Sequence, residues 1–258
     1  MARIVGNDVA DFQGQINFDI YKNNSNFLIT KATEGTGFTA NTLKRNQSES
    51  RRVGLPLGYY HFARPDVGNT PEAEADYFLS KLGELKEGEL LVLDYEPPNQ
   101  KQTDVDWCRK WLDRVASKTN GTKPLIYLNQ SQIKQFNWQT VIDGGYGLWI
   151  AAYTYDPNNN TFDDGEFPFA AMQQWTNKQQ IPGIPSLAVD GNVFFGDVAT
   201  FKKYGYKLPA PAPTPIDYKA LYDAEVIKNN DLKNQLAAAN TKNAELQSKI
   251  DKAKADLA

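Results

Sequence analysis

The chain has 258 residues, of which 41% are hydrophobic and 12% aromatic, and its formal net charge is -3. This length allows one large domain with an appendage, and the apolar fraction excludes a wholly disordered chain. The net negative charge argues against a nucleic-acid partner, which requires a basic footprint.

Cysteine and histidine are each present once. Cys108 alone excludes an internal disulfide, and His61 alone leaves too few ligands for a zinc site such as that of a zinc amidase. We therefore expect no metal and no cofactor.

Eight short β-like runs recur along the first 208 residues, with helical segments between them. The runs lie at residues 3–8, 27–31, 57–62, 90–96, 124–129, 148–153, 171–175 and 186–194. This alternation is typical of a parallel β/α fold, and eight is the number of strands that closes a β/α barrel. The spacing shortens after the sixth run. We therefore expect an α/β fold, an irregular TIM-barrel-like barrel with shortened final helices.

The composition changes after Leu208. Residues 209–216 are rich in proline and predict an extended linker. Residues 217–258 repeat every seven positions, with one seam of Tyr222, Asn229, Leu236, Asn243, Ile250 and Leu257, and a second of Tyr218, Glu225, Leu232, Ala239, Leu246 and Ala253. This pattern favours a coiled coil, in which asparagine at core positions fixes register and chain number. The expected organisation is a barrel at 1–208, a linker at 209–216 and a helix at 217–258 that forms homo-oligomers or stays single.

Two acids follow the buried run LLVL. Asp94 and Glu96 are two residues apart, so they project to the same face of a strand, at the carboxyl end where barrel active sites are built. Two carboxylates that close repel each other, and one should retain a proton near neutral pH. Glycosidic cleavage needs such an acid beside an ionised carboxylate. The motif alone also fits a solvated strand end or a calcium site.

Further acids occur in the first and last runs. Asp8 closes the first run and Asp190 closes the eighth, and these two strands are neighbours in a closed barrel. We therefore expect Asp8, Asp94, Glu96 and Asp190 to meet as the catalytic group at one mouth. The other strand ends supply groups suited to a sugar polymer, namely Lys31, Glu34, Tyr60, Phe62, Tyr127, Trp149, Tyr153 and Gln174.

Eight segments together resemble a known family. In this order, DVADFQG, FLITKATEG, GYYHFARP, LVLDYEP, LIYLN, LWIAAY, QQWT and VDGNVF are similar to glycoside hydrolase family 25, the Chalaropsis-type lysozymes of phage endolysins and bacterial autolysins. The resemblance covers about residues 1–208. It implies hydrolysis of the β-1,4 bond from N-acetylmuramic acid to N-acetylglucosamine in peptidoglycan.

Position by position, the resemblance implies that Glu96 is the general acid and Asp94 its partner carboxylate. Asp8 and Asp190 match the flanking acids, and Tyr60 matches a tyrosine of the cleft. Ala10 and Gln173 depart from the family's usual Ser and Trp, which bears on substrate fit more than on catalysis.

Three other functions remain open. The barrel could be an inactive wall-binding or phage structural module, or a glycosidase of chitin-like polymers. A Cys108/His61 peptidase is the third, although Cys108 shares a helical face with Trp111, Leu112 and Val115 and its pattern favours a buried hydrophobic residue. We expect His61 to be structural or cleft-lining.

The N-terminal sequence MARIVGND lacks the apolar core of a signal peptide, and no stretch is long and apolar enough to span a bilayer. We therefore expect no membrane insertion. The absence of an export signal favours a phage endolysin, made in the host cytoplasm and acting at the cell wall after release.

Overall fold

The computed structural model describes residues 2–209 and 217–257, and it divides into two compact units, residues 1–209 and 210–258. Apart from Pro209, the predicted linker lies outside the described residues. The strands of the first unit are β1 (Ile4–Val9), β2 (Phe27–Glu34), β3 (Phe38–Thr39), β4 (Leu57–Phe62), β5 (Leu90–Asp94), β6 (Leu125–Asn129), β7 (Gly147–Ala151), β8 (Ala170–Gln179) and β9 (Val189–Phe194). Its helices are α1 (Phe18–Tyr21), α2 (Leu43–Val53), α3 (Pro71–Leu82), α4 (Thr103–Lys118), α5 (Gln130–Gln135), α6 (Gln139–Asp143) and α7 (Val198–Tyr204), with short 3-10 turns η1 (Asp11–Gln13) and η2 (Pro65–Val67).

Eight of these strands close into a barrel. The sheet order is β1-β9-β8-β7-β6-β5-β4-β2, and β1 also pairs with β2, which closes the ring, while the short β3 extends it from β2. The predicted irregular β/α barrel is therefore confirmed. Its final units are shortened as expected, since α5 and α6 have six and five residues and no helix lies between β7 and β9.

The direction of the last strand differs from the expectation. A parallel β/α arrangement was predicted for all eight runs, but β9 runs antiparallel to both β1 and β8. The connection from β8 to β9 is too short for the crossover that parallel strands need, so the chain returns as in a hairpin. Asp190 consequently lies near the start of its strand, so the prediction that it closes the strand is wrong. It still pairs with Asp8, because the start of an antiparallel strand meets the end of its neighbour.

Successive side chains of a strand point in opposite directions and pack into two different hydrophobic cores. Leu90 and Val92 of β5 belong to the core inside the barrel, whereas Leu91 and Leu93 belong to the core between strands and helices. The alternation places Asp94 on the inner face, one step beyond Val92. Apolar residues thus fill the lower barrel, and polar side chains begin at the carboxyl ends of the strands.

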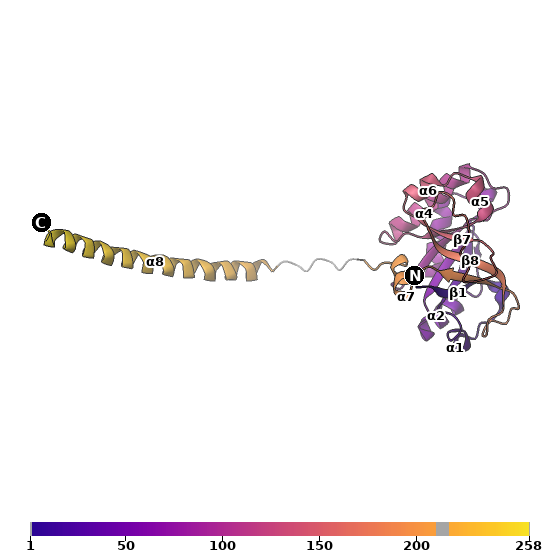
Figure 1. The fold of residues 1–258 in the computed structure, drawn as a ribbon, viewed down its shortest axis with the longest axis horizontal. Coiled ribbons are helices and arrows are strands. Elements are labelled where there is room, and N and C mark those ends of the chain that lie inside the picture. Colours follow the sequence, from indigo (N-terminus) through magenta and orange to yellow (C-terminus); the bar gives the residue numbers. More distant parts are fainter. Residues whose placement is uncertain (1, 210–216, 258) are drawn as a thin grey trace. The chain divides into compact units, whose positions relative to one another are not determined.

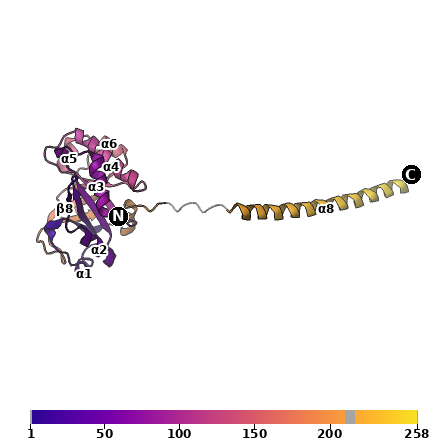
Figure 2. The ribbon, with the colours of Figure 1, turned by 180° about the vertical axis from the view of Figure 1, so that it is seen from behind.

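The helices cover the outside of the sheet. In Figures 1 and 2, α4, α5 and α6 gather on one side of the barrel, while α1 and α2 lie on the opposite side. Helix α7 instead contributes Phe201 to the inner core, where its ring stacks on Phe27 at 5.0 Å between centroids. Because Phe27 begins β2, α7 covers the amino-terminal end of the barrel and leaves the other end open.

The second unit is one helix, α8 (Tyr218–Asp256). Asp217 caps its start by accepting a hydrogen bond from the backbone N–H of Ala220 at 2.9 Å. From residue 219 to 257 every side chain is exposed. None of the helices that the structure describes has the length and apolarity that a membrane crossing requires.

Candidate active site

The open end of the barrel contains a cavity of about 300 Å³. The four predicted catalytic acids, Asp8, Asp94, Glu96 and Asp190, all line it. So do seven of the eight residues predicted to bind substrate: Lys31, Tyr60, Phe62, Tyr127, Trp149, Tyr153 and Gln174. Glu34 does not line this cavity.

Asp94 and Glu96 lie at different depths. Asp94 is the last residue of β5 and is buried, and its Oδ1 has no hydrogen-bond partner among the described residues. Glu96 lies just beyond the strand and is exposed. It precedes Pro97, which favours an extended backbone and so continues the alternation of the strand. The pair therefore offers one deep and one accessible carboxyl group.

The electrostatics favour retention of a proton by this pair. Burial, followed by the charges of Glu96 and Asp8, raises the pKa of Asp94 well above its usual range, and the positive charge of Lys31 opposes the rise. Desolvation of its carboxyl group raises the pKa of Glu96 as well, although the side chain is exposed overall; the neighbouring Asp94 side chain opposes the rise and the charge of Asp8 adds to it. Because the two groups interact strongly, their protons belong to the pair rather than to either residue.

Asp8 is held by two side-chain amides. Its Oδ1 accepts hydrogen bonds from Nε2 of Gln174 at 3.0 Å and Nδ2 of Asn192 at 2.8 Å. Both amide orientations are fixed, since the oxygen of Asn192 accepts from the indole of Trp149 and that of Gln174 accepts from the hydroxyls of Tyr127 and Tyr153. Burial outweighs these hydrogen bonds and raises the pKa of Asp8, while the two amides limit the rise. The amides point donors at Asp8 and so favour its ionised form against the effect of burial.

Asp190 completes the acidic group. It is paired with Asp8 across β1 and β9 and is partly buried. Burial, with the charges of Asp8 and Glu96, raises the pKa of Asp190 to about 8. The four acids thus share one field, in which the charge of Asp8 raises the pKa of each of the other three.

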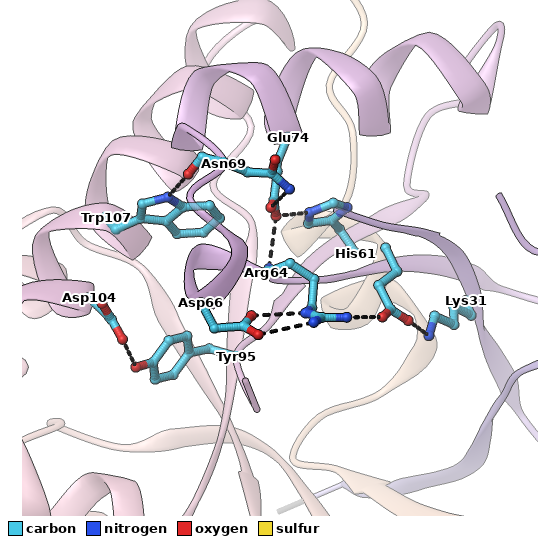
Figure 3. A network of polar contacts seen from close by, with 10 residues as sticks. Lys31, His61, Arg64, Asp66, Asn69, Glu74, Tyr95, Asp104 and Trp107 are labelled. Carbon is cyan, nitrogen blue, oxygen red and sulfur yellow. Dashed lines mark hydrogen bonds and ion pairs between the residues drawn. The ribbon is translucent and has the colours of Figure 1, made fainter. Parts of the chain in front are cut away.

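Lys31 provides positive charge in the cavity lining. Its ammonium lies 2.7 Å from Glu34 and 4.8 Å from the centre of the Phe62 ring. Glu34 also binds Arg64 at 2.9 Å. Arg64 in turn binds Asp66 at 2.9 Å, as Figure 3 shows. Glu34, predicted to bind substrate, therefore has both oxygens occupied in bracing Lys31 and Arg64.

His61 and Cys108 lie away from the cavity. His61 is fully buried, and its Nε2 lies 2.8 Å from Glu74, as Figure 3 shows. Its Nδ1 lies 2.8 Å from Thr33, and its ring stacks on Trp111. Burial lowers the pKa of His61 and raises that of Cys108 well above its usual range. Neither group lines the cavity, so the geometry disfavours the peptidase alternative and gives His61 a structural role.

Two features of the mouth were missed in the sequence. Asn192 holds Asp8, and strand alternation two residues from Asp190 would have identified it. Phe12 lines the cavity as an exposed ring, and no periodic signal marks a residue of a short turn. Among the described residues, no group of three or more His, Cys, Asp or Glu side chains is arranged to hold a metal ion.

A β/α barrel with interacting carboxyl groups and aromatic side chains at its carboxyl-terminal mouth is an arrangement of glycoside hydrolases. The model of the family described as glycosyl hydrolases family 25 matches residues 7–184, and the chain belongs to this family.

Known proteins show the same similarity. An N,O-diacetylmuramidase from Arthroderma benhamiae is 29% identical over 136 residues, which are 48% of this chain and 57% of that protein. The chain thus spans less than two thirds of that relative. A muramidase structure from Acremonium alcalophilum is 27% identical with a TM-score of 0.65, covering 78% of this chain and 98% of that one. The CTP1L endolysin structure is 27% identical with a TM-score of 0.65, covering 81% of this chain and 71% of that one.

Proposed function

We propose that this protein is an N-acetylmuramidase that cleaves the β-1,4 bond between N-acetylmuramic acid and N-acetylglucosamine in peptidoglycan. The observation that carries the proposal is the Asp94–Glu96 pair. It lies in one cavity with Asp8 and Asp190, and the raised pKa of both carboxyl groups favours retention of a proton by the pair. The similar proteins named as muramidases support the substrate.

Glu96 is the accessible member of the pair and donates the proton to the glycosidic oxygen as the bond to the sugar breaks. Asp94 lies deeper with an acceptor oxygen free. Because the pair shares its protons, cleavage proceeds from the form in which Glu96 holds the proton and Asp94 is ionised, and Asp94 then stabilises the positive charge that develops at the sugar. It does so directly or by orienting the substrate's own N-acetyl group. Water then supplies hydroxyl to the sugar and returns a proton to the pair, which restores the enzyme.

The test compares the wild-type chain with Glu96→Gln on purified peptidoglycan. The substitution keeps the shape and removes the acid, so the release of reducing ends should fall by about 10²–10⁴-fold. Glu72→Gln, an exposed acid on α3, is the matched control and should retain full activity. Near-wild-type activity of Glu96→Gln would refute the assignment.

The products separate this function from its alternatives. Mass spectrometry of the fragments should find N-acetylmuramic acid at the new reducing end. N-acetylglucosamine there would indicate a different glycosidase. A wild-type chain that binds peptidoglycan and releases nothing would be an inactive wall-binding or phage structural module.

We further propose that the protein acts as a phage endolysin at the bacterial cell wall. The similarity to the CTP1L endolysin supports this role. Bacteria that produce the chain internally should lyse when a pore-forming agent opens the membrane. Cells that produce Glu96→Gln should not lyse. Equal survival of both cultures would contradict the role.

For α8 we propose self-association through the seven-residue seams. The apolar side chains that the structure describes in α8, including Leu232, Leu236, Leu246 and Ile250, are exposed, and a second copy of the same helix offers complementary seams. Linked catalytic units would bind a polymer with higher avidity. Sedimentation should show an oligomer for the intact chain and a monomer for a chain ending at Leu208. A monomeric intact chain would refute the proposal.

A further inference from the structure

Phe12 presents a large apolar surface at the cavity that the acids share. It lies in η1, directly after β1, and 92% of its surface is exposed although it lines the cavity. We propose that Phe12 is a stacking platform for one N-acetylhexosamine ring of the bound glycan, outside the pair of acids that cleaves the bond. The inference rests on the proposed function and specifies where the polymer is held.

Hydrogen bonds to the preceding residue, Asp11, hold the turn that contains Phe12. Asp11 accepts four hydrogen bonds, from the backbone N–H groups and the side chains of Asn41 and Thr42, at 2.8 to 3.1 Å. Partial burial alone would raise the pKa of Asp11, but these bonds outweigh it and lower the pKa. The carboxylate is therefore fixed at the start of α2, where unpaired N–H groups favour a negative charge.

The two ends of the turn are fixed as well. The side-chain oxygen of Gln13 accepts the backbone N–H of Ala10 at 2.7 Å. Gly14 follows with φ of 72°, a left-handed value that favours glycine, and ends the turn. The neighbours of Phe12 are thus tied to the barrel while its own ring projects outward.

The position fits an extended sugar polymer. The sheet order places β1 across the barrel from β5 and β6, so the turn after β1 lies on the far side of the mouth from Glu96. Isolated apolar residues on a surface need no explanation, but this one lines a cavity with five other aromatic residues and is held on a fixed turn. Aromatic faces in such cavities hold the apolar face of a ligand while nearby polar groups orient it.

The first test measures binding without turnover. In a Glu96→Gln background, co-sedimentation with purified peptidoglycan sacculi compares Phe12→Ala, Phe12→Trp and Phe169→Ala. Phe169 is another exposed phenylalanine that does not line the cavity, so it controls for loss of an exposed ring. Phe12→Ala should weaken binding about tenfold, equivalent to about 1.4 kcal/mol, whereas Phe12→Trp and Phe169→Ala should bind as the parent does.

The second test uses the active chain and soluble, un-crosslinked glycan strands. Phe12→Ala should raise KM about tenfold with kcat within about twofold, since the ring contacts a sugar away from the reacting atoms. Asp11→Ala should raise KM in the same direction because the ring is no longer held in place. The double variant should match Phe12→Ala, since Asp11 acts through the ring.

The outcomes are distinct. If Phe12→Ala binds and turns over as Phe169→Ala does, the platform is refuted, while wild-type cleavage leaves the proposed function standing. If the double variant has a KM above that of Phe12→Ala by the full factor measured for Asp11→Ala alone, Asp11 does not act through Phe12. The positioning argument then fails. If the wild-type chain cleaves nothing, the proposed function is refuted, and the sacculus comparison still decides whether Phe12 contacts glycan.

Discussion

Two helices of this chain make opposite use of their apolar residues. Helix α4 buries Cys108, Trp111, Leu112 and Val115 against the barrel. Helix α8 is more than twice as long, with 39 residues against 16, yet every described side chain from residue 219 onward is exposed. Both have periodic apolar positions in the sequence.

The difference shows what periodicity determines. An apolar repeat specifies a helix and the face that seeks burial, but the covering partner comes from the rest of the chain or from another molecule. In the barrel, the strands supply that partner. Helix α8 forms a unit by itself with its described side chains exposed, and the covering partner that we propose for it is a second copy of the helix.

The largest expected effect comes from one substitution made in both helices. Leu112→Ala removes a fully buried side chain and should lower the free energy of unfolding by about 2–5 kcal/mol. Leu236→Ala removes a side chain that is 62% exposed and should change barrel stability by less than about 0.5 kcal/mol. All five tryptophans lie before residue 209, so their fluorescence during urea unfolding reports on the barrel alone.

The comparison would fail in either of two ways. A small effect of Leu112→Ala would mean that α4 can close the cavity left behind. A large effect of Leu236→Ala on tryptophan fluorescence would mean that α8 stabilises the barrel directly.

Most of the barrel could be predicted because strand alternation and inter-run spacing are local signals. All eight predicted runs correspond to strands of the closed barrel. The two-residue β3 was missed because two residues show no period. The direction of β9 was wrong because alternation does not record strand direction, and only the short connection before Val189 could have indicated it.

The candidate site was predictable where residues end strands. Asp94 ends β5 and Asp8 is the last residue but one of β1, and sheet closure brings them to one cavity. Glu34 could not be placed, since its pairing with Arg64 is a tertiary contact between residues 30 positions apart. Phe12 was also missed as a residue of the cavity, because the contacts that hold its turn come from residues 41 and 42.

Asp190 should make the stability of the barrel unit depend on pH. The folded state raises the pKa of Asp190 from 3.8 to about 8, so the fold binds this proton more tightly than the unfolded chain does. The resulting stabilisation is present below pH 4 and is lost as pH rises through about 8. Because Asp190 is only partly buried, we expect wild-type stability to fall by about 2 kcal/mol more than that of Asp190→Asn between pH 5 and pH 8.

Urea unfolding at both pH values measures this difference. Asp231→Asn on α8 is the matched control, since it lies in the other unit and should keep the wild-type slope. If the stability of the wild type and of Asp190→Asn changes with pH in parallel, the fold does not raise the pKa of Asp190, and the prediction is wrong.

The smallest effect is expected in α8. Asn243 occupies a seam position between Leu236 and Ile250, where a polar residue fixes chain number and costs stability. Asn243→Leu should shift the association midpoint to about tenfold lower concentration, about 1.4 kcal/mol, and broaden the range of oligomers. Asn230→Leu makes the same change next to the seam residue Asn229, on the outer face, and should leave the midpoint unchanged. Analytical ultracentrifugation across a dilution series distinguishes them. If both variants behave as wild type does, the seam is not an interface, and α8 is a solvated helix whose repeat has no packing partner.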